Sequence, residues 1–418
     1  MDRRDIIRGL ASLPILGFLG WSYAEKKSRE EEVKNAILNE LNITAKAPST
    51  VGSMNGDTIR LGIIGAGGRG RHLMRASGFA EPAWLEMVKE GLRENPNDGR
   101  LKTFLEQEDL NVRFTAVCDV FDVHADLGMA AATTEDSTPK KYSRYQDLLA
   151  DKEVDAVIIA TPDHLHAPMC IDAIKAGKHV YVEKCMTHKI GETYELKETA
   201  LANPNVVFQV GHQHRQTLSF LTAMDIIDKN VLGHVSLIEA ATNRNDDVGA
   251  WQYEIHKDAN PNTVDWEQFL GPAPKIPFNA EHLFRWRKWW AYGTGLSGDL
   301  LTHDYDRINC ILKMGIPDSV MTSGGVYTHR DGRDVPDVMN VCMEYPDFST
   351  GSTQNKGKEK GMTFLYTATL GNSYWRPTKL MGHDATLELG NQLTVYPDRN
   401  STRYQTFFEE ETIESGTP

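Results

Sequence analysis

The chain has 418 residues, which is too long for one ordinary core and predicts two folded domains behind a leader. It carries 58 acidic and 45 basic residues without a basic cluster, which argues against a nucleic-acid partner. Its five scattered cysteines lack CxxC spacing, so they indicate neither a disulfide framework nor a structural zinc site.

The N-terminus, residues 1–24, resembles a twin-arginine signal peptide. Arg3 and Arg4 precede sixteen uncharged residues, 9–24, that end in Ser-Tyr-Ala, a pattern suited to cleavage. We therefore expect a periplasmic protein. The alternative is an uncleaved segment that anchors the protein in the inner membrane facing the periplasm, and only then is a membrane a partner. Residues 25–57 predict a charged helix and a linker.

Residues 61–70, LGIIGAGGRG, follow an apolar strand-like run and precede a helix-like stretch. In this context the GxGxxG spacing predicts a dinucleotide site: Gly65 permits the turn, Gly67 lets the backbone approach a pyrophosphate, and Gly70 packs the helix on the strand. The helix N-terminus offers free N–H groups to the phosphates. The predicted cofactor contacts in this loop are Gly65, Gly67, Gly68, Arg69 and Gly70.

Residues 58–212 alternate apolar runs with helix-like segments, which predicts a doubly wound Rossmann domain of the α/β class. The stretch 81–111 is longer than one crossover needs and indicates an inserted helix and loop. The second run ends in Asp119, whose carboxylate is placed to bind the adenosine ribose and to repel a 2′-phosphate. We therefore expect NAD rather than NADP, although Asp119 could instead cap the next helix.

Residues 213–418 contain longer strand candidates separated by turns. In residues 363–370, Phe364 and Tyr366 alternate with more polar neighbours. This pattern is typical of an antiparallel sheet with one covered face. We expect a C-terminal α+β substrate domain with a large, mostly antiparallel sheet.

Four further segments accompany the glycine loop: TPDHLHAP at 161–168, AGKHVYVEKC at 176–185, VGHQHRQ at 210–216 and GTGLSGDLLTHDYD at 293–306. In this order and at these separations they resemble the glucose-fructose oxidoreductase, inositol dehydrogenase and MocA family (Gfo/Idh/MocA). The resemblance covers roughly residues 58–390. It implies the two-domain fold above, a homodimer or homotetramer, and a carbohydrate substrate.

The resemblance also implies a catalytic site. Glu183 and Lys184 match the family's Glu-Lys-Pro motif, so Lys184 is expected to lie beside the nicotinamide and to contact the hydroxyl that is oxidised. A cysteine replaces the proline, which leaves the local backbone geometry open. His303 is expected to exchange a proton with the substrate and Asp299 to hydrogen-bond the sugar. At i and i+4 these two residues share a helix face, where they could also be a plain surface pair. Asp299, His303 and Asp306 could also bind a metal, but most of the resembled family works without one, so we expect no metal site.

Other segments supply further candidates. By resemblance, Thr161, Pro162 and His166 line the nicotinamide half of the cofactor site. His214 and Arg215 follow a strand at the same edge and are weaker candidates for substrate contact. Trp286 lies in the aromatic and basic segment HLFRWRKWWAYGTG, where it could stack on a sugar ring or fill the core.

These observations predict an NAD(P)-dependent oxidoreductase of a sugar, polyol or glycoside. Because a periplasm has no soluble NAD pool, the cofactor is expected to be loaded in the cytosol and held tightly. The alternative is a redox-assisted glycoside hydrolase or 3-keto-glycoside-forming enzyme, in which the hydride returns to the product. A non-catalytic sugar-binding or assembly protein is disfavoured by the glycine loop, Lys184 and His303.

Overall fold

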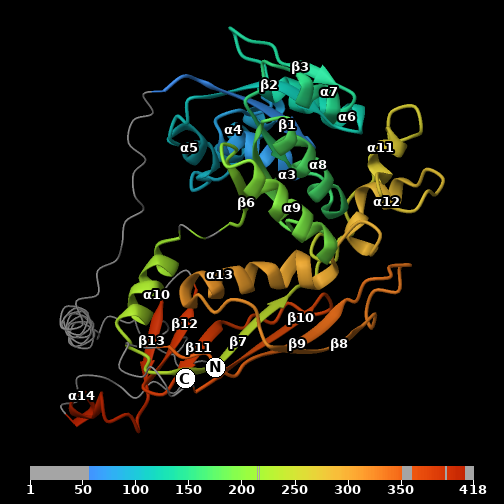
Figure 1. Ribbon diagram of the computed structural model, residues 1–418. Helices are drawn as coiled ribbons and strands as arrows, with labels where there is room; N and C mark the ends of the chain where they lie inside the picture. The colour runs from blue at the N-terminus through green and yellow to red at the C-terminus, as the bar shows by residue number, and fades with distance from the viewer. Residues whose placement is uncertain (1–55, 214, 216, 351–359, 391–392, 410–418) are drawn as a thin grey trace.

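The computed structural model describes residues 56–409 except 214, 216, 351–359 and 391–392. The predicted signal peptide and most of the charged linker lie outside this part of the chain. Figure 1 shows a blue-to-green domain above a sheet drawn mostly in orange and red, with helix α13 (Thr302–Leu312) lying along the sheet on the side that faces the upper domain. None of the helices in the described ranges is both long and apolar enough to cross a membrane.

The N-terminal domain is the predicted Rossmann domain. Its six strands are all parallel and lie in the order β3-β2-β1-β4-β5-β6. Five of them coincide with the apolar runs of the sequence, whereas β3 is a three-residue strand, Lys-Lys-Tyr, with no apolar run to reveal it. The strands are β1 (Ile59–Ile64), β2 (Val112–Cys118), β3 (Lys140–Tyr142), β4 (Ala156–Ile159), β5 (His179–Glu183) and β6 (Phe208–Gly211).

Helices connect these strands and cover both faces of the sheet. The expected insertion between β1 and β2 forms α4 and α5, and Glu81 fastens it to α3 through ion pairs to Arg71 (2.7 Å) and Arg75 (3.0 Å). The domain's helices are α3 (Gly68–Ala76), α4 (Pro82–Glu94), α5 (Arg100–Leu105), α6 (Asp122–Ala132), α7 (Tyr145–Ala150), α8 (Asp163–Lys175) and α9 (Ile190–Ala202).

The C-terminal domain contains the predicted mostly antiparallel sheet. Its seven strands lie in the order β13-β12-β11-β7-β10-β9-β8, and only the β7–β10 pair is parallel. The strands are β7 (Val235–Asn243), β8 (Ser319–Gly325), β9 (Val338–Tyr345), β10 (Met362–Thr369), β11 (Thr378–Gly382), β12 (Ala385–Leu389) and β13 (Thr394–Pro397). A short helix, α14 (Gln405–Glu409), follows them.

One face of this sheet is covered by helices. Phe364 and Tyr366 in β10 are fully buried, while their neighbours on the opposite face are partly exposed, as the alternation predicts. Helices α10 (Leu218–Asp228) and α13 pack on the buried face through residues such as Phe220 and Ile308. Helix α13 is therefore held between the sheet below it and the N-terminal domain above it.

After β7 the chain returns to the N-terminal domain. This docking segment, residues 250–301, contains α11 (Trp266–Leu270), α12 (Ala280–Phe284), the 3-10 turn η1 (Trp286–Lys288) and the π turn η2 (Ser297–Leu301). Val264 forms a β-bridge with Phe121, and Asp122 N donates to Thr263 O at 3.0 Å. The segment thereby covers the edge of the Rossmann sheet at which the strands end.

Candidate active site

A cleft of about 590 Å³ lies between the carboxyl edge of the Rossmann sheet, the docking segment and the start of α13. Parallel sheets bind ligands at this edge. Most of the residues predicted from the sequence line the cleft. These are Gly65, Gly67, Gly68, Arg69, Asp119, Thr161, Pro162, Glu183, Lys184, Trp286, Asp299 and His303.

The glycine loop has the shape that a dinucleotide requires. Gly65 has φ +90, and a Cβ there would lie 2.8 Å from Ala160 O. A Cβ on Gly70 would lie 1.9 Å from Gly65 O, so this glycine packs helix against strand and does not line the cleft. Gly68 has open space, and α3 begins there without a side-chain cap. Free N–H groups and open space at a helix N-terminus fit a pyrophosphate.

Asp119 lies at the end of β2 and holds the glycine loop. Its Oδ2 accepts from Ala66 N at 2.7 Å and its Oδ1 from Phe121 N at 2.8 Å. The N-cap of α6 is Phe121, so Asp119 is not the cap of that helix. Its carboxylate lies in the cleft wall next to the loop, where it can act on a ribose as well as on the backbone.

Lys184 and Asp299 form an ion pair at the base of the cleft. Lys184 Nζ lies 2.6 Å from Asp299 Oδ1 and also donates to the Asp299 carbonyl at 3.0 Å. Arg287 Nε donates to the same Oδ1 at 2.9 Å, and Trp251 Nε1 to Oδ2 at 3.0 Å. Burial alone would raise the pKa of the Asp299 carboxyl, but Arg287 and Lys184 outweigh this and hold it well below its usual range.

This arrangement gives Asp299 a role that differs from the predicted one. Both of its oxygens are already bonded, so its first effect is to orient Lys184 and Arg287. Nor does it share a regular α-helix with His303, since it lies in the π turn η2 and His303 in α13. Such π turns occur frequently at functional sites, where they change the direction of a side chain.

His303 lines the cleft beside this ion pair. Its Nδ1 is buried without a hydrogen-bond partner in the described part of the chain. Burial, reinforced by the nearby Lys184 cation, lowers the pKa of His303 to about 3. The imidazole is therefore neutral at physiological pH, and one of its ring nitrogens can accept a hydrogen bond.

Besides Gly70, three predicted residues lie elsewhere or cannot be placed. His166 is fully buried outside the cleft, with its ring nitrogens 2.5 Å from Cys185 O and 2.8 Å from Thr161 O. Arg215 donates through Nε and Nη2 to the two carboxylate oxygens of Asp306 and does not line the cleft. His214 lies outside the described residues.

The structure also shows the backbone geometry of the motif that contains Lys184. The peptide bond between Lys184 and Cys185 is cis, which answers the question raised by the cysteine at this position. Glu183, on its other side, pairs with Arg69 of the glycine loop at 2.8 Å. No group of three or more His, Cys, Asp or Glu side chains within the described ranges could hold a metal ion.

Sequence reasoning missed three cleft or near-cleft residues: Arg287, Trp251 and Arg244. Arg287 lies 4.2 Å from the Trp286 ring centroid and orients that indole by a cation–π contact. The basic and aromatic segment around Trp286 was the only local signal for Arg287. Nothing local signals Trp251, which is fully buried and separated from its partner by 48 residues.

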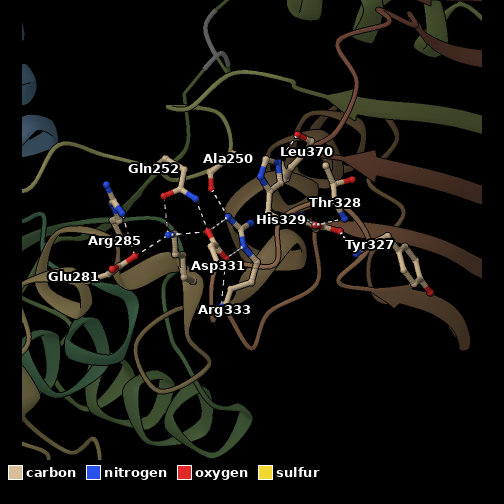
Figure 2. A network of polar contacts seen from close by, with 12 residues as sticks. Ala250, Gln252, Glu281, Arg285, Tyr327, Thr328, His329, Asp331, Arg333 and Leu370 are labelled. Atoms are coloured by element: carbon tan, nitrogen blue, oxygen red, sulfur yellow. Dashed lines mark hydrogen bonds and ion pairs between the residues drawn. The ribbon is translucent and has the colours of Figure 1, made fainter.

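A buried polar network around Lys288 holds the turn that contains Arg287. Lys288 is fully buried and donates to Gln252 Oε1 at 2.8 Å, while pairing with Glu281 (3.0 Å) and Asp331 (2.8 Å). Figure 2 shows Gln252, Glu281 of α12, and Asp331 and Arg333 of a third segment lying close together. The loops that carry Arg287 and Trp251 are therefore fastened to each other.

The comparisons with known proteins agree with this arrangement. A model of the NAD-binding Rossmann fold of an oxidoreductase family, GFO_IDH_MocA, matches residues 59–212, and a model of its C-terminal alpha/beta domain matches residues 226–374. A levoglucosan dehydrogenase of Pseudarthrobacter phenanthrenivorans is 26% identical over 254 residues, which are 55% of this chain and 57% of that protein.

Two further relatives show how far the likeness extends. Inositol 2-dehydrogenase of Salmonella typhimurium is 28% identical over 127 residues, 30% of this chain and 37% of that protein. A solved levoglucosan dehydrogenase with NADH and L-sorbose has a TM-score of 0.57 at 16% identity, with 83% of this chain and 78% of that chain covered. This structural likeness shows a shared fold. The aligned part of this chain spans 57% of the levoglucosan dehydrogenase and 37% of the inositol 2-dehydrogenase.

The two family models together match most of the chain. The glycine loop, Lys184 and His303 meet in the cleft between the two matched domains. The chain therefore belongs to the Gfo/Idh/MocA family of NAD-binding oxidoreductases.

Proposed function

We propose that this protein oxidises a hydroxyl group of a small carbohydrate, a sugar or polyol, with NAD held in the cleft. The observation that carries the proposal is the meeting of Lys184 and His303 next to the glycine loop. When bound along that loop, NAD supplies the hydride acceptor. The names of the relatives, a levoglucosan and an inositol dehydrogenase, support a carbohydrate substrate.

The side chains divide the work on the substrate hydroxyl. Lys184 uses two of its N–H groups on Asp299, which leaves one to hydrogen-bond the hydroxyl oxygen. The neutral imidazole of His303 can take the hydroxyl proton as the adjacent C–H bond breaks. Asp299 holds Lys184 in place through these two bonds, and Arg287 holds Asp299 in the same orientation.

The proposed net reaction is oxidation rather than glycoside hydrolysis. The named dehydrogenases favour oxidation, and the cleft residues described above account for removal of one hydroxyl proton. The two reactions have different products. Hydrolysis releases a free aglycone with no net change in NADH, whereas oxidation accumulates NADH or passes its hydride to a second substrate.

We further propose that the protein is exported by the twin-arginine route and acts in the periplasm. Arg3, Arg4 and the following uncharged run support this location. Because that compartment holds no soluble NAD, the cofactor would be loaded before export and retained. We also propose a homodimer or homotetramer, supported by partly exposed Thr363 and Leu365 on the uncovered face of the C-terminal sheet.

The function can be tested in two steps. In the first step, purified protein is denatured and the small molecules released into the supernatant are identified by mass spectrometry. We expect to find NAD rather than NADP. The native protein is then incubated with a panel of sugars, polyols and glycosides, each scored for nicotinamide absorbance and for released aglycone. Release of aglycone with no absorbance change in single turnover would favour hydrolysis, and no reduction of NAD by any compound would refute the proposed oxidation.

A further inference from the structure

Arg244 enters the cleft from the end of β7 on a fixed backbone. Its N–H donates to Thr369 O at 2.9 Å, and its carbonyl accepts from Asn372 N at 3.1 Å. Its aliphatic part packs on Gly249, where a Cβ would lie 2.9 Å from Arg244 Cβ and 3.1 Å from its Cδ. The side chain lines the cleft. Its position is therefore set before any ligand arrives.

Arg244 differs from the other cationic residues of the cleft in its lack of a carboxylate partner among the described residues. The other lysine and arginines of the cleft have carboxylate partners: Arg69 pairs with Glu183, while Lys184 and Arg287 pair with Asp299. In the part of the chain that the structure describes, no hydrogen bond or ion pair of the Arg244 guanidinium is found.

Two carboxylates lie in the neighbourhood of Arg244 without pairing with it. Asp304 bonds Thr242 Oγ1 at 2.9 Å and pairs with Arg307, and it acts on Arg244 only at longer range. Asp246 accepts from Gly249 N at 2.7 Å. Since both carboxylates have other donors, the Arg244 guanidinium keeps its hydrogen-bonding capacity for a ligand.

We propose that Arg244 binds an oxyanion on the substrate, so that the site is selective for acidic sugars over neutral ones. This inference rests on the proposed function and narrows its substrate class. A guanidinium binds a carboxylate or a phosphate through two parallel hydrogen bonds, which fixes orientation as well as charge. The oxyanion is therefore a sugar-acid carboxylate or a sugar phosphate, carried away from the hydroxyl that Lys184 contacts.

Arg244 does not lie in the part of the cleft that would bind the phosphates of the cofactor. The phosphate cradle is formed by Gly67 and Gly68 at the start of α3 in the N-terminal domain. Arg244 belongs to the C-terminal sheet, beside Asp304 at the start of α13, the helix that carries His303. It thus lies with the catalytic residues at the substrate end of the cleft.

The test compares matched substrates in the NAD-loaded protein. We measure kcat/KM by NADH absorbance for glucose, glucuronate and glucose 6-phosphate, and for galactose and galacturonate. We expect an anionic member to exceed its neutral partner, and Arg244→Gln to lower kcat/KM for that anionic substrate on the order of 10- to 100-fold, since a hydrogen-bonded charge is lost. Arg244→Lys should recover part of the loss because it keeps the charge.

The controls separate selectivity from folding and from cofactor binding. Arg113 is an exposed residue near the start of β2, at the other end of that strand from Asp119. Arg113→Gln should leave every rate unchanged. NAD affinity, measured by calorimetry, should be the same in Arg244→Gln and wild type. The inference would be overturned by a preference for neutral sugars, by an anion preference that survives Arg244→Gln, or by a large loss of NAD affinity in that variant. Oxidation of neutral sugars alone would still leave the proposed function intact. Failure of every compound to reduce NAD would overturn both.

Discussion

Lys184 carries the first prediction at the scale of single residues. Lys184→Ala should leave NAD binding nearly intact, because Asp299 keeps Arg287 and Trp251 as donors. Hydride transfer should slow by about 10²- to 10⁴-fold, the usual contribution of a positioned acid or base. Single-turnover nicotinamide absorbance measures this step, and His303→Ala should slow it as well.

A matched control is available for this substitution. Lys175→Ala removes an exposed lysine at the end of α8 and should change neither cofactor binding nor rate. Wild-type rates of hydride transfer in both Lys184→Ala and His303→Ala would mean that the active site lies elsewhere.

The low pKa of His303 makes stability depend on pH. The pKa is about 3 in the folded protein because of burial and the nearby Lys184 cation, against an ordinary value of 6.5. Stability from the neutral imidazole is therefore complete above pH 6.5 and is lost as pH falls towards 3. We expect the unfolding temperature to fall over this range, and to fall less steeply in His303→Gln; identical pH dependence in the two proteins would contradict this origin.

Asp119 carries the prediction on cofactor choice. NAD should bind more tightly than NADP, and Asp119→Ala should weaken NAD by about 1 to 3 kcal/mol through lost hydrogen bonds. Because Asp119 also holds Ala66 N, this variant loosens the glycine loop. Asp119→Asn is the sharper comparison, since it removes the charge and keeps an acceptor oxygen. Calorimetry on stripped protein in which the wild type prefers NADP would contradict the assignment.

At the scale of structural elements, the buried network around Lys288 holds η1 against the loops that carry Gln252 and Asp331. Lys288→Met leaves the carboxylates of Glu281 and Asp331 short of a buried cation. Breaking such a pair costs about 3 to 5 kcal/mol. We expect a matching loss in the free energy of unfolding, measured with denaturant, and a lower kcat/KM because Arg287 lies in η1.

The control for this network is a lysine on the surface. Lys102→Met removes an exposed side chain of α5, 3.9 Å from Glu106, and should change the free energy of unfolding by less than about 0.5 kcal/mol. Equal effects of the two substitutions would show that the buried network contributes nothing special.

The elements also show what the sequence could predict. The long apolar runs and the alternation in β10 predicted their strands because both patterns are local. The three-residue strand β3 and the short edge strand β13 were missed, since neither has an apolar run long enough to indicate a strand. The regular helix expected over Asp299 and His303 contains a π turn, because bonds to distant residues fix Asp299.

The candidate site also contains residues that the sequence predicts and residues that it does not. The glycine loop, Lys184 and His303 were predicted from motifs that are short in sequence. Arg287 and Arg244 were not, because their importance depends on which charges lie nearby in space. Their partners, or the absence of partners within the described chain, follow from the meeting of segments far apart in sequence. No local pattern contains that information.

At the scale of the whole molecule, the leader carries a prediction. If Arg3 and Arg4 are the export signal, changing both to lysine should retain the protein in the cytosol, because the receptor reads the arginine pair. Fractionation followed by immunoblotting measures this. A single Arg8→Lys change, outside the pair, is the matched control, and unchanged periplasmic recovery of the double variant would refute the export proposal.

The docking segment has a consequence for how this protein matures. The cleft runs from Ile64 in the first strand to His303 after the docking segment, and both domains supply its walls. The nucleotide site is therefore complete only after the chain has emerged past α13 and its two halves have joined. We therefore expect retained NAD to report on correct assembly, and a chain truncated before α13 to lose the nucleotide during purification.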